Sequence, residues 1–377
     1  MTLSSKSRTE LVEYCKKNNI RGHSRKTKSE LIDLITEHLF READSQQPNV
    51  NDSDEKIQST DKLRMVDLFA GTGAFTYAFE NTGKVDCLFA NDMSSHSKQI
   101  YDANFSHPLT LKDLNDISPR DIPPHDILTG GFPCQPFSIA GHQEGFKDPR
   151  SNVFWKIIEI ITHHKPSCIV LENVKNLLSH DDGRTIKIII SSLEECGYNI
   201  KYSVLNTSEI TGVPQNRERI YIAGFRSKEC YDKFNLEFPS VSKLPISQML
   251  VQGNIPNKYY YTASSSTWDL VSQSVTKRDT IYQYRRVYVR ENKNSVCPTL
   301  TANMGTGGHN VPIILDNVGI RKLTPRECYN FQGFPSSYTL PSMSDAQLYK
   351  LAGNAVSVPV VKCIAERVIS ILTSMSG

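Results

Sequence analysis

The sequence has no segment suited to crossing a membrane and no cysteine pattern of a disulfide scaffold or zinc site. None of its apolar runs approaches the roughly 18 residues needed to span a bilayer, and its first residues are polar rather than signal-like. Its nine cysteines are far apart and include no Cys-x-x-Cys pair. We therefore expect a protein of the reducing cytoplasm, with no membrane association and no metal.

A strong net charge is also missing. The formal charge is +3 over 377 residues, which is too small to indicate a nucleic-acid partner, because net charge reports on solubility and steering. Any such partner has to be inferred from local motifs. The length exceeds that of one average domain and predicts two or three compact regions.

Composition and periodicity change along the chain and divide it into five segments. Residues 1–39 predict a pair of short amphipathic helices around a basic turn, and residues 40–61 predict a flexible linker because they hold too few apolar residues to fold alone. Residues 62–239 alternate short apolar runs with helical patterns. Residues 240–318 predict a smaller irregular domain, and residues 319–377 return to the preceding α/β domain with a final helix.

The alternation within residues 62–239 predicts an α/β domain with a doubly wound, Rossmann-like sheet. The predicted strands are Met65–Phe69, Cys87–Asn91, Asp126–Leu128, Cys168–Glu172, Lys201–Leu205 and Ile220–Phe225. The predicted helices are Asn152–His163, Thr185–Cys196 and, near the C-terminus, Pro359–Thr373.

A glycine-bearing turn follows the first predicted strand. Gly71 and Gly73 let the backbone approach a ligand closely, and the amides that open the next helix can face a polar or anionic group. About twenty residues on, Asp92 ends the second strand, where Rossmann-like folds place a carboxylate for ribose hydroxyls. Capping of the following helix is an alternative role for Asp92. Asp113 is a further carboxylate in this order, suited to an adenine amino group or simply exposed in a loop. The spacing alone leaves a nicotinamide-dependent oxidoreductase open.

Reactive and charged residues lie beside the later strands. Cys134 follows the third predicted strand in a loop rich in glycine and proline, at the edge where open α/β sheets bind ligands, although most cysteines are inert core residues. Glu172 ends the next strand, where a surface or capping role is the alternative. Arg217 and Arg219 directly precede the last strand, where a solvated turn is the alternative.

Six blocks of this sequence resemble, in order, those of the cytosine-C5 DNA methyltransferase family. They are Asp67–Gly73, Pro133-Cys134-Gln135, Glu172-Asn173-Val174, Gln215-x-Arg217-x-Arg219, the run from Leu323 to Pro335, and Gly353-Asn354-Ala355-Val356. The resemblance covers residues 64–374. It implies transfer of a methyl group from S-adenosylmethionine to carbon 5 of cytosine in DNA.

The resemblance implies four catalytic residues. Cys134 matches the nucleophile, whose thiolate adds to carbon 6 so that carbon 5 becomes enamine-like. Glu172 resembles the residue that contacts cytosine N3 and the exocyclic amine, where a proton relieves the negative charge on the ring. Arg217 and Arg219 resemble the supporting cations, and Arg219 is the better candidate for contacting the base.

The resemblance also implies a binding site for S-adenosylmethionine. The matching positions are Phe69, Gly71, Thr72, Gly73, Asp92, Met93, Asp113, Pro133, Asn354 and Ala355. Three positions depart from the family pattern: Ala74 replaces a common glycine, Met93 stands where an aromatic residue often packs on adenine, and Ala355 stands where serine also occurs. None of these changes removes a required functional group, so we expect them to affect affinity more than activity.

A double-stranded DNA substrate requires the target base to be flipped out of the helix. Residues 240–318 lie where the family keeps its target-recognition domain, and Tyr282–Arg290 offers arginines and aromatic rings for contacts with phosphates or bases. The expected DNA contacts are Gln135, Ser138, Arg285, Arg286 and Thr299.

The N-terminal helix pair resembles a SAP-type DNA-binding module through Glu10-Leu11, the Gly22 turn and Lys28–Ile32. A solvated helical hairpin without a ligand is the alternative. We expect a monomeric, nucleoid-associated enzyme whose cognate restriction endonuclease acts separately. Two rival functions are a tRNA methyltransferase on the same scaffold, which the large insert opposes, and a catalytically silent DNA-binding relative, which Cys134 and Glu172 oppose.

Overall fold

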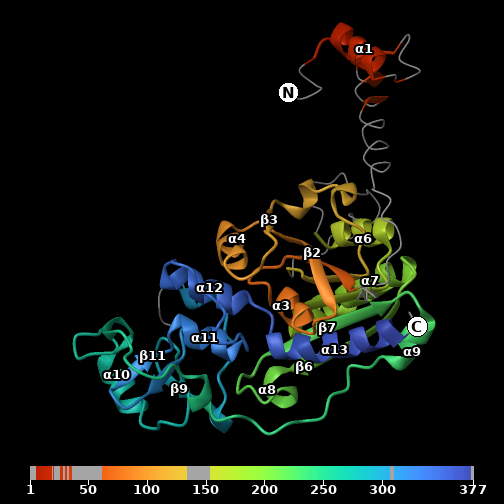
Figure 1. Cartoon of the computed structure of the whole chain (residues 1–377). Coiled ribbons are helices and arrows are strands. Elements are labelled where there is room, and N and C mark those ends of the chain that lie inside the picture. Colours follow the sequence, from red (N-terminus) through yellow and green to blue (C-terminus); the bar gives the residue numbers. More distant parts are fainter. Residues whose placement is uncertain are drawn as a thin grey trace, which may run out of the picture. The chain divides into compact units, whose positions relative to one another are not determined.

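The computed structural model describes residues 6–18, 20, 26–28, 30, 31, 34, 35, 62–133, 153–305 and 310–374 (Figure 1). The chain forms two compact units, residues 1–59 and residues 60–377. Three predicted site residues, Cys134, Gln135 and Ser138, lie outside the described residues, as does the predicted linker.

The N-terminal unit contains helix α1 (Arg8–Lys17), as the periodicity predicts. Ser7 and Glu10 form a capping box at its start, each side chain accepting a hydrogen bond from the other residue's backbone amide. Leu11 and Cys15 on α1 pack with Ile20, Leu31 and Ile35 in a small separate core. Part of the second predicted helix lies outside the described residues, so the helical pair stays a prediction.

The second unit is built on a seven-stranded sheet with the order β3-β2-β1-β4-β5-β7-β6. Its strands are β1 (Leu63–Leu68), β2 (Val85–Asp92), β3 (Thr110–Leu111), β4 (Ile127–Gly131), β5 (Cys168–Val174), β6 (Asn199–Asn206) and β7 (Glu218–Phe225). The strands from β3 to β5 are parallel, whereas β7 runs antiparallel to both β5 and β6. All six predicted strands are present, and the α/β class is confirmed; β3 and the reversed direction of β7 were not predicted.

Helices cover both faces of this sheet, which explains why its central strands are apolar on both sides. On one face, side chains such as Met65 and Val170 pack with α3 (Ala74–Glu80), α4 (Ser95–Asp102) and α13 (Val358–Ser374). On the other face, Val66 and Ile169 pack with α6 (Val153–His164) and α7 (Arg184–Glu195). Figure 1 shows α13 along one side of β6 and β7 and α6 and α7 beyond the other.

A smaller sheet follows after the chain leaves β7 at Phe225. Four antiparallel strands form it in the order β11-β10-β8-β9: β8 (Tyr282–Tyr284), β9 (Val289–Glu291), β10 (Ile313–Leu315) and β11 (Ile320–Lys322). Val271, Val275, Tyr282, Ile313 and Ile320 make a core of their own behind it. The region predicted as irregular therefore contains a sheet of short strands, and β11 extends past residue 318.

The remaining elements are short, apart from α12. The α-helices are α8 (Thr207–Ile210), α9 (Lys228–Lys233), α10 (Trp268–Ser274), α11 (Pro325–Phe331) and α12 (Asp345–Asn354). The 3-10 helices are Leu114–Asp116, Pro119–Asp121, Lys175–Leu178, His180–Gly183, Ile246–Met249, Asn257–Tyr259, Lys293–Ser295 and Ala302–Gly305. Among the described residues, no helix has the length and apolar character to cross a membrane.

Candidate active site

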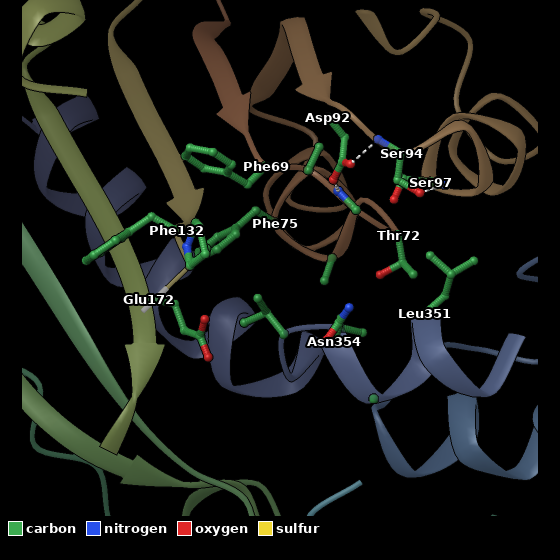
Figure 2. A pocket seen from close by; sticks show the side chains of 18 of the residues that line it. Phe69, Thr72, Phe75, Asp92, Ser94, Ser97, Phe132, Glu172, Leu351 and Asn354 are labelled. Atoms are coloured by element: carbon green, nitrogen blue, oxygen red, sulfur yellow. Dashed lines mark hydrogen bonds between the residues drawn. The ribbon is translucent and has the colours of Figure 1, made fainter. Parts of the chain in front are cut away.

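A cavity of about 460 Å³ opens at the carboxyl ends of β1, β2, β4 and β5, with α12 along one wall. We call it the main pocket. Figure 2 shows Asp92 at one end, Glu172 at the other, and Asn354 between them on α12. Ten residues predicted for the site line it: Phe69, Gly71, Thr72, Asp92, Pro133, Glu172, Arg217, Arg219, Asn354 and Ala355. The sheet edge therefore brings together residues that are nearly 290 positions apart in the sequence.

The turn after β1 holds an unusual backbone conformation. Phe69, Gly71 and Gly73 have φ angles of 55°, 55° and 70°, a region that glycine tolerates and phenylalanine does not favour. The Gly71 amide donates to Asp92 Oδ2 at 3.0 Å, and Tyr338 Oη donates to the Thr72 carbonyl at 2.7 Å. The turn is thus held from both sides while its ligand-facing surface stays open to the pocket.

Gly73 does not line the main pocket. A Cβ atom on it would lie 2.3 Å from Cε2 of Phe105 and 2.9 Å from Cε2 of Tyr101. Gly73 is also the residue that precedes α3, in the left-handed conformation. The structure therefore gives it a packing role, and its predicted contact with the cofactor stays a prediction.

Asp67 lies beneath this turn and is fully buried. Its Oδ2 accepts from Oγ1 of Thr76 on α3 at 2.8 Å, and its Oδ1 accepts from Oγ1 of Thr129 on β4 at 2.9 Å. Burial raises the pKa of the Asp67 carboxyl to about 6, although these hydrogen bonds act in the opposite direction. The sequence block contains Asp67, but sequence reasoning gave it no role; its place just before the turn was the available signal.

The structure assigns helix capping to Ser94 and a place at the pocket wall to Asp92, two roles that the sequence left open for Asp92. Ser94 is the N-cap of α4, because its Oγ accepts from the Ser97 amide. Asp92 accepts from the amides of Gly71 and Ser94 and keeps its carboxylate at the pocket wall. Burial raises the pKa of Asp92 despite these amide donors. Asp92 is therefore available to a ligand.

Two predicted cofactor residues lie away from the main pocket. Met93 has 72% of its side chain exposed. Asp113 precedes a 3-10 helix, where its Oδ1 accepts from the Asn115 amide at 2.9 Å. Neither residue lines the pocket in this structure, so a contact with a cofactor stays a prediction for both.

Glu172 and Arg219 form an ion pair at the opposite end of the pocket. Arg219 Nε lies 3.1 Å from Glu172 Oε1, and only 15% and 10% of the two side chains are exposed. Burial raises the pKa of Glu172, while Arg219 and Arg217 act to lower it. Gly131 lies beside this carboxyl, since a Cβ there would be in van der Waals contact with Glu172 Oε2 at 3.4 Å. The result is a buried carboxyl with one cation beside it and a free face toward the pocket.

The segment that leads to Cys134 is tied to β5. Asn173 Nδ2 donates to the Phe132 carbonyl at 3.0 Å, and Asn173 is buried. Pro133, which precedes Cys134 in the sequence, lines the main pocket. Asn173 belongs to the block Glu172-Asn173-Val174, and its buried side-chain amide explains why this block has an asparagine there.

Arg217 is buried and bound to backbone on several segments. Its Nη1 donates to the Leu300 carbonyl at 3.0 Å, and its Nη2 donates to the carbonyls of Gly353 at 3.2 Å and Ala355 at 2.6 Å. Burial and the neighbouring Arg219 lower its pKa to about 9. Its guanidinium therefore connects the start of β7, the segment between β9 and β10, and the end of α12.

Other pocket residues were not predicted. They include Phe75, Ser94, His96, Ser97, Phe132, Gln347, Lys350 and Leu351. Gln347 and Leu351 lie one helical turn apart on α12, and a hydrogen bond joins Gln347 Nε2 to His96 Nε2 on α4. Residues four positions apart on a helix share one face, and this spacing is the signal that Gln347 and Leu351 carry. The sequence does not show which face of α12 lies against the turn after β1, so the pocket-lining face could not be identified from the spacing alone.

Two of the predicted DNA contacts line a second cavity. This polar cavity of about 780 Å³ is lined by Arg285 and Thr299 together with Lys243, Arg290 and Lys293, among others. Thr299 Oγ1 donates to the Asn216 carbonyl at 2.6 Å. Arg286 is exposed beside this cavity and does not line it.

The fold matches that of solved methyltransferases. The Entamoeba histolytica methyltransferase EhMeth superposes with a TM-score of 0.64 at 20% identity, covering 82% of this chain and 99% of that one. The S. pombe Dnmt2 methyltransferase gives a TM-score of 0.64 at 20% identity, covering 84% and 100%. The architecture is therefore that of the Rossmann-like, S-adenosylmethionine-dependent methyltransferases.

Sequence comparison gives the family. The model of the C-5 cytosine-specific DNA methylase family matches residues 63–370, and the chain belongs to this family. It is 47% identical to the type II methyltransferase M.Bsp6I of Bacillus sp. (strain RFL6), over 81% of this chain and 98% of the relative. It is 39% identical to M.SsoII of Shigella sonnei, over 83% and 82%, and 32% identical to M.HpaII of Haemophilus parainfluenzae, over 91% and 99%. The resemblance stated from the motifs is thereby confirmed, and the chain is a DNA cytosine-C5 methyltransferase.

Proposed function

We propose that this enzyme methylates carbon 5 of a flipped cytosine at a specific site in double-stranded DNA, through a covalent bond between Cys134 and carbon 6. The observation that carries the proposal is the buried Glu172–Arg219 pair, which shares one pocket with the glycine turn and with Pro133, next to Cys134 in the sequence. The similar relatives are named type II methyltransferases, which supports a role in a restriction-modification system.

The residues present fit S-adenosylmethionine. When bound, this cofactor supplies an electrophilic methyl group. Thr72 Oγ1 is buried at the pocket wall without a hydrogen-bond partner among the described residues, which favours a polar ligand there. Asp92 is positioned to accept from ribose hydroxyls, and Asn354 faces the same space. Phe69, Gly71, Pro133 and Ala355 complete this half of the pocket.

The other half of the pocket suits the cytosine ring. The Cys134 thiolate adds to carbon 6, and electron density moves into the ring toward N3 and carbon 5. Glu172, whose pKa is raised by burial, holds a proton to share with N3 and so limits the charge that develops there. Arg219 keeps the carboxyl in place and adds a positive charge beside the ring. After methylation, loss of the proton on carbon 5 allows the sulfur to leave.

Arg217 acts as a positioning residue in this scheme. Both of its terminal nitrogens already donate to main-chain carbonyls, and only its Nε is without a partner among the described residues. By fixing the Leu300, Gly353 and Ala355 carbonyls, it sets the distance between the cofactor wall and the recognition segment. Arg219 is the cation assigned to the base.

DNA recognition is assigned to residues 240–318, with contacts from Arg285, Arg286 and Thr299 and from Gln135 and Ser138. The N-terminal unit provides a second DNA contact, since residues 1–39 include many basic side chains. The enzyme acts as a monomer in the cytoplasm, on nucleoid DNA, and a cognate endonuclease acts separately.

Incubating the full chain with labelled S-adenosylmethionine and either duplex DNA or tRNA tests the substrate class. Bisulfite sequencing of DNA from cells that express the chain then identifies the modified position and its sequence context. We expect labelled duplex DNA and protected cytosines in one short sequence. Label on tRNA alone, or on no nucleic acid, would contradict the proposed function.

A further inference from the structure

The hairpin of β8 and β9 ends in a well-defined tip, residues 285–288, which we call the hairpin tip. The Arg285 amide donates to the Tyr288 carbonyl at 2.8 Å, and Tyr284 Oη donates to the Arg286 carbonyl at 2.7 Å. Arg286 has a φ of 62°, which turns the chain tightly at this point. These hydrogen bonds therefore hold the backbone of the tip in one conformation.

The base of the hairpin is anchored. Tyr282 is 1% exposed, packs in the core of the small sheet, and accepts from the Lys277 amide at 3.0 Å. Thr280 Oγ1 donates to the Asn292 carbonyl at 2.9 Å, and Asn292 Nδ2 donates to the Ile281 carbonyl at 3.0 Å. An anchored base with a projecting tip is suited to entering a groove on a partner.

The apolar side chains at the tip are left in water. Val287 is 82% exposed and Tyr288 is 52% exposed. The sheet core behind them is formed by other residues, so these two side chains contribute little to folding. Single exposed apolar residues are common, and exposure alone indicates no partner.

Cationic side chains surround this tip. Arg285, Arg286 and Arg290 are all exposed, and none of them forms an ion pair with a carboxylate among the described residues. The 780 Å³ polar cavity at the foot of the hairpin adds Lys243 and Lys293, and its lining also includes Glu209 and Glu291. Unpaired cations around an apolar tip fit a polyanion whose interior offers apolar edges, as a nucleic-acid groove does.

A second turn of the same sheet shows that this arrangement is not general. Val318, between β10 and β11, is 81% exposed. Beside it, Asp316 accepts from the Val318 and Gly319 amides and pairs with Arg321, so the local charge is balanced. The Val318 turn thus holds Asp316 beside two arginines, Arg321 and Arg278, the second of which donates to Asn317 Oδ1, whereas residues 285–288 hold two arginines and no carboxylate. Of these two turns, the hairpin tip is the one without an acidic residue.

We propose that Val287 and Tyr288 enter a groove of duplex DNA and contact base edges, so that they determine part of the recognition sequence. The surrounding arginines contact phosphates and set the depth of insertion. This inference rests on the proposed function and assigns sequence reading to two residues of its recognition region. Apolar contacts discriminate bases that carry a methyl or an exposed ring edge in the groove.

The test compares Val287→Ala/Tyr288→Ala with Val318→Ala in the full chain. The substrates are a duplex with the methylated site found by bisulfite sequencing and duplexes in which each base pair of that site is changed singly. The measured quantity is the ratio of kcat/KM between the original and the changed duplexes. Thermal unfolding of both variants shows whether either substitution alters folding. The single variant Val287→Ser is a further control for altered folding.

We expect the tip variant to reduce that ratio by about tenfold or more for at least one base pair, the scale of a single lost base contact. Val318→Ala should keep the ratio of the unaltered chain. Arg286→Gln should instead weaken binding to all duplexes and reduce the slope of log affinity against log salt by about 0.9.

An unchanged ratio in a folded tip variant would overturn the proposal while leaving the proposed function intact. An equal loss with Val318→Ala would also overturn it, because the effect would then be nonspecific. A chain that methylates no DNA even without substitutions would instead overturn the proposed function.

Discussion

The carboxyl edge of the seven-stranded sheet and the β8–β9 hairpin of the four-stranded sheet treat charged side chains in opposite ways. At the edge of the seven-stranded sheet, Asp67, Glu172 and Arg217 are buried and held by named hydrogen-bond or ion-pair partners. At the hairpin of the four-stranded sheet, Arg285 and Arg286 project into solvent without an ion pair among the described residues. Chain length and overall composition give no hint of this separation.

The difference reflects what each region has to do. A group that stabilises developing charge works best when it is fixed beforehand and shielded from water. A group that contacts a phosphate must stay free until the partner arrives, and its contribution depends on salt. We therefore expect substitutions in the large sheet to affect the chemical step or folding, and substitutions on the basic surfaces to affect binding.

The largest effect should come from Cys134→Ala. Removing the thiolate should lower methyl transfer by roughly 10⁴-fold or more, as for other covalent nucleophiles, while DNA and cofactor binding stay measurable. Single-turnover transfer of labelled methyl groups would measure the loss. Cys363→Ala, on α13 and away from the pocket, is the control. A rate for Cys134→Ala within about tenfold of the rate of the unaltered chain would rule out the covalent mechanism.

Glu172→Gln should slow the chemical step by about 10²- to 10⁴-fold, because an amide cannot transfer a proton to N3. Because burial raises the pKa of Glu172, the protonated form persists to higher pH, and the unaltered rate should fall as pH rises through that pKa. Glu218→Gln is the control, since Glu218 pairs with Lys175 at the surface of the same sheet edge. An unchanged single-turnover rate in Glu172→Gln would remove it from this role.

Asp67→Asn should change how stability depends on pH. The pKa of Asp67 is raised from 3.8 to about 6, so its contribution to stability is fully present below pH 3.8 and is lost as pH rises through 6. Between pH 4 and pH 8 the unaltered chain should lose roughly 2 kcal/mol of unfolding free energy relative to Asp67→Asn. Denaturant unfolding at a series of pH values measures this, with Asp86→Asn, exposed on β2, as the control. If the free energy of unfolding of the unaltered chain and of Asp67→Asn depended on pH in the same way, burial would not raise the pKa of Asp67.

The smallest effect should follow from deleting residues 1–60. If about three of the basic residues in this segment meet phosphates, the slope of log affinity against log salt should become shallower by roughly 2.7. The methylated sequence should not change, because phosphate contacts position a protein without reading bases. Binding to duplex DNA over a salt series, for the full chain and for a chain starting at Asp61, measures this slope. Equal slopes would reject a DNA-binding role for the N-terminal unit.

Much of the fold could be predicted from the sequence because its strands are buried on both faces and flanked by long amphipathic helices. The direction of β7 could not be predicted, because an apolar run looks the same in either orientation and pairing is decided by the connection. β3 has only two residues, too few for any periodicity. The small sheet was missed because its strands have three residues each.

The candidate site was predictable where a motif carried it and not elsewhere. Glu172 and Arg219, which belong to the blocks, lie in one pocket with Asp92, which was predicted from its place at the end of the second strand. The packing role of Gly73 depends on Phe105, which is far along the chain and carries no signal of contact. Likewise, Arg217 donates to main-chain carbonyls. Because any residue type can supply a main-chain carbonyl, the sequence does not indicate these partners.

The segment after the recognition hairpin shows how the two parts of the enzyme are joined. The Cys297 amide donates to the Pro214 carbonyl and the Asn216 amide donates to the Cys297 carbonyl, at 2.7 and 2.8 Å. A Cβ on Gly353 would lie 2.1 Å from the Thr301 carbonyl carbon, so only glycine permits α12 to approach this closely. Residues 297–301 are thus bound to the loop before β7 and packed against α12, both of which belong to the catalytic part of the enzyme. A chimera that takes the recognition hairpin from a relative should fold when the exchanged segment ends before Val296. If the exchanged segment ends within residues 297–301, α12 must come from the same relative so that the two still pack together.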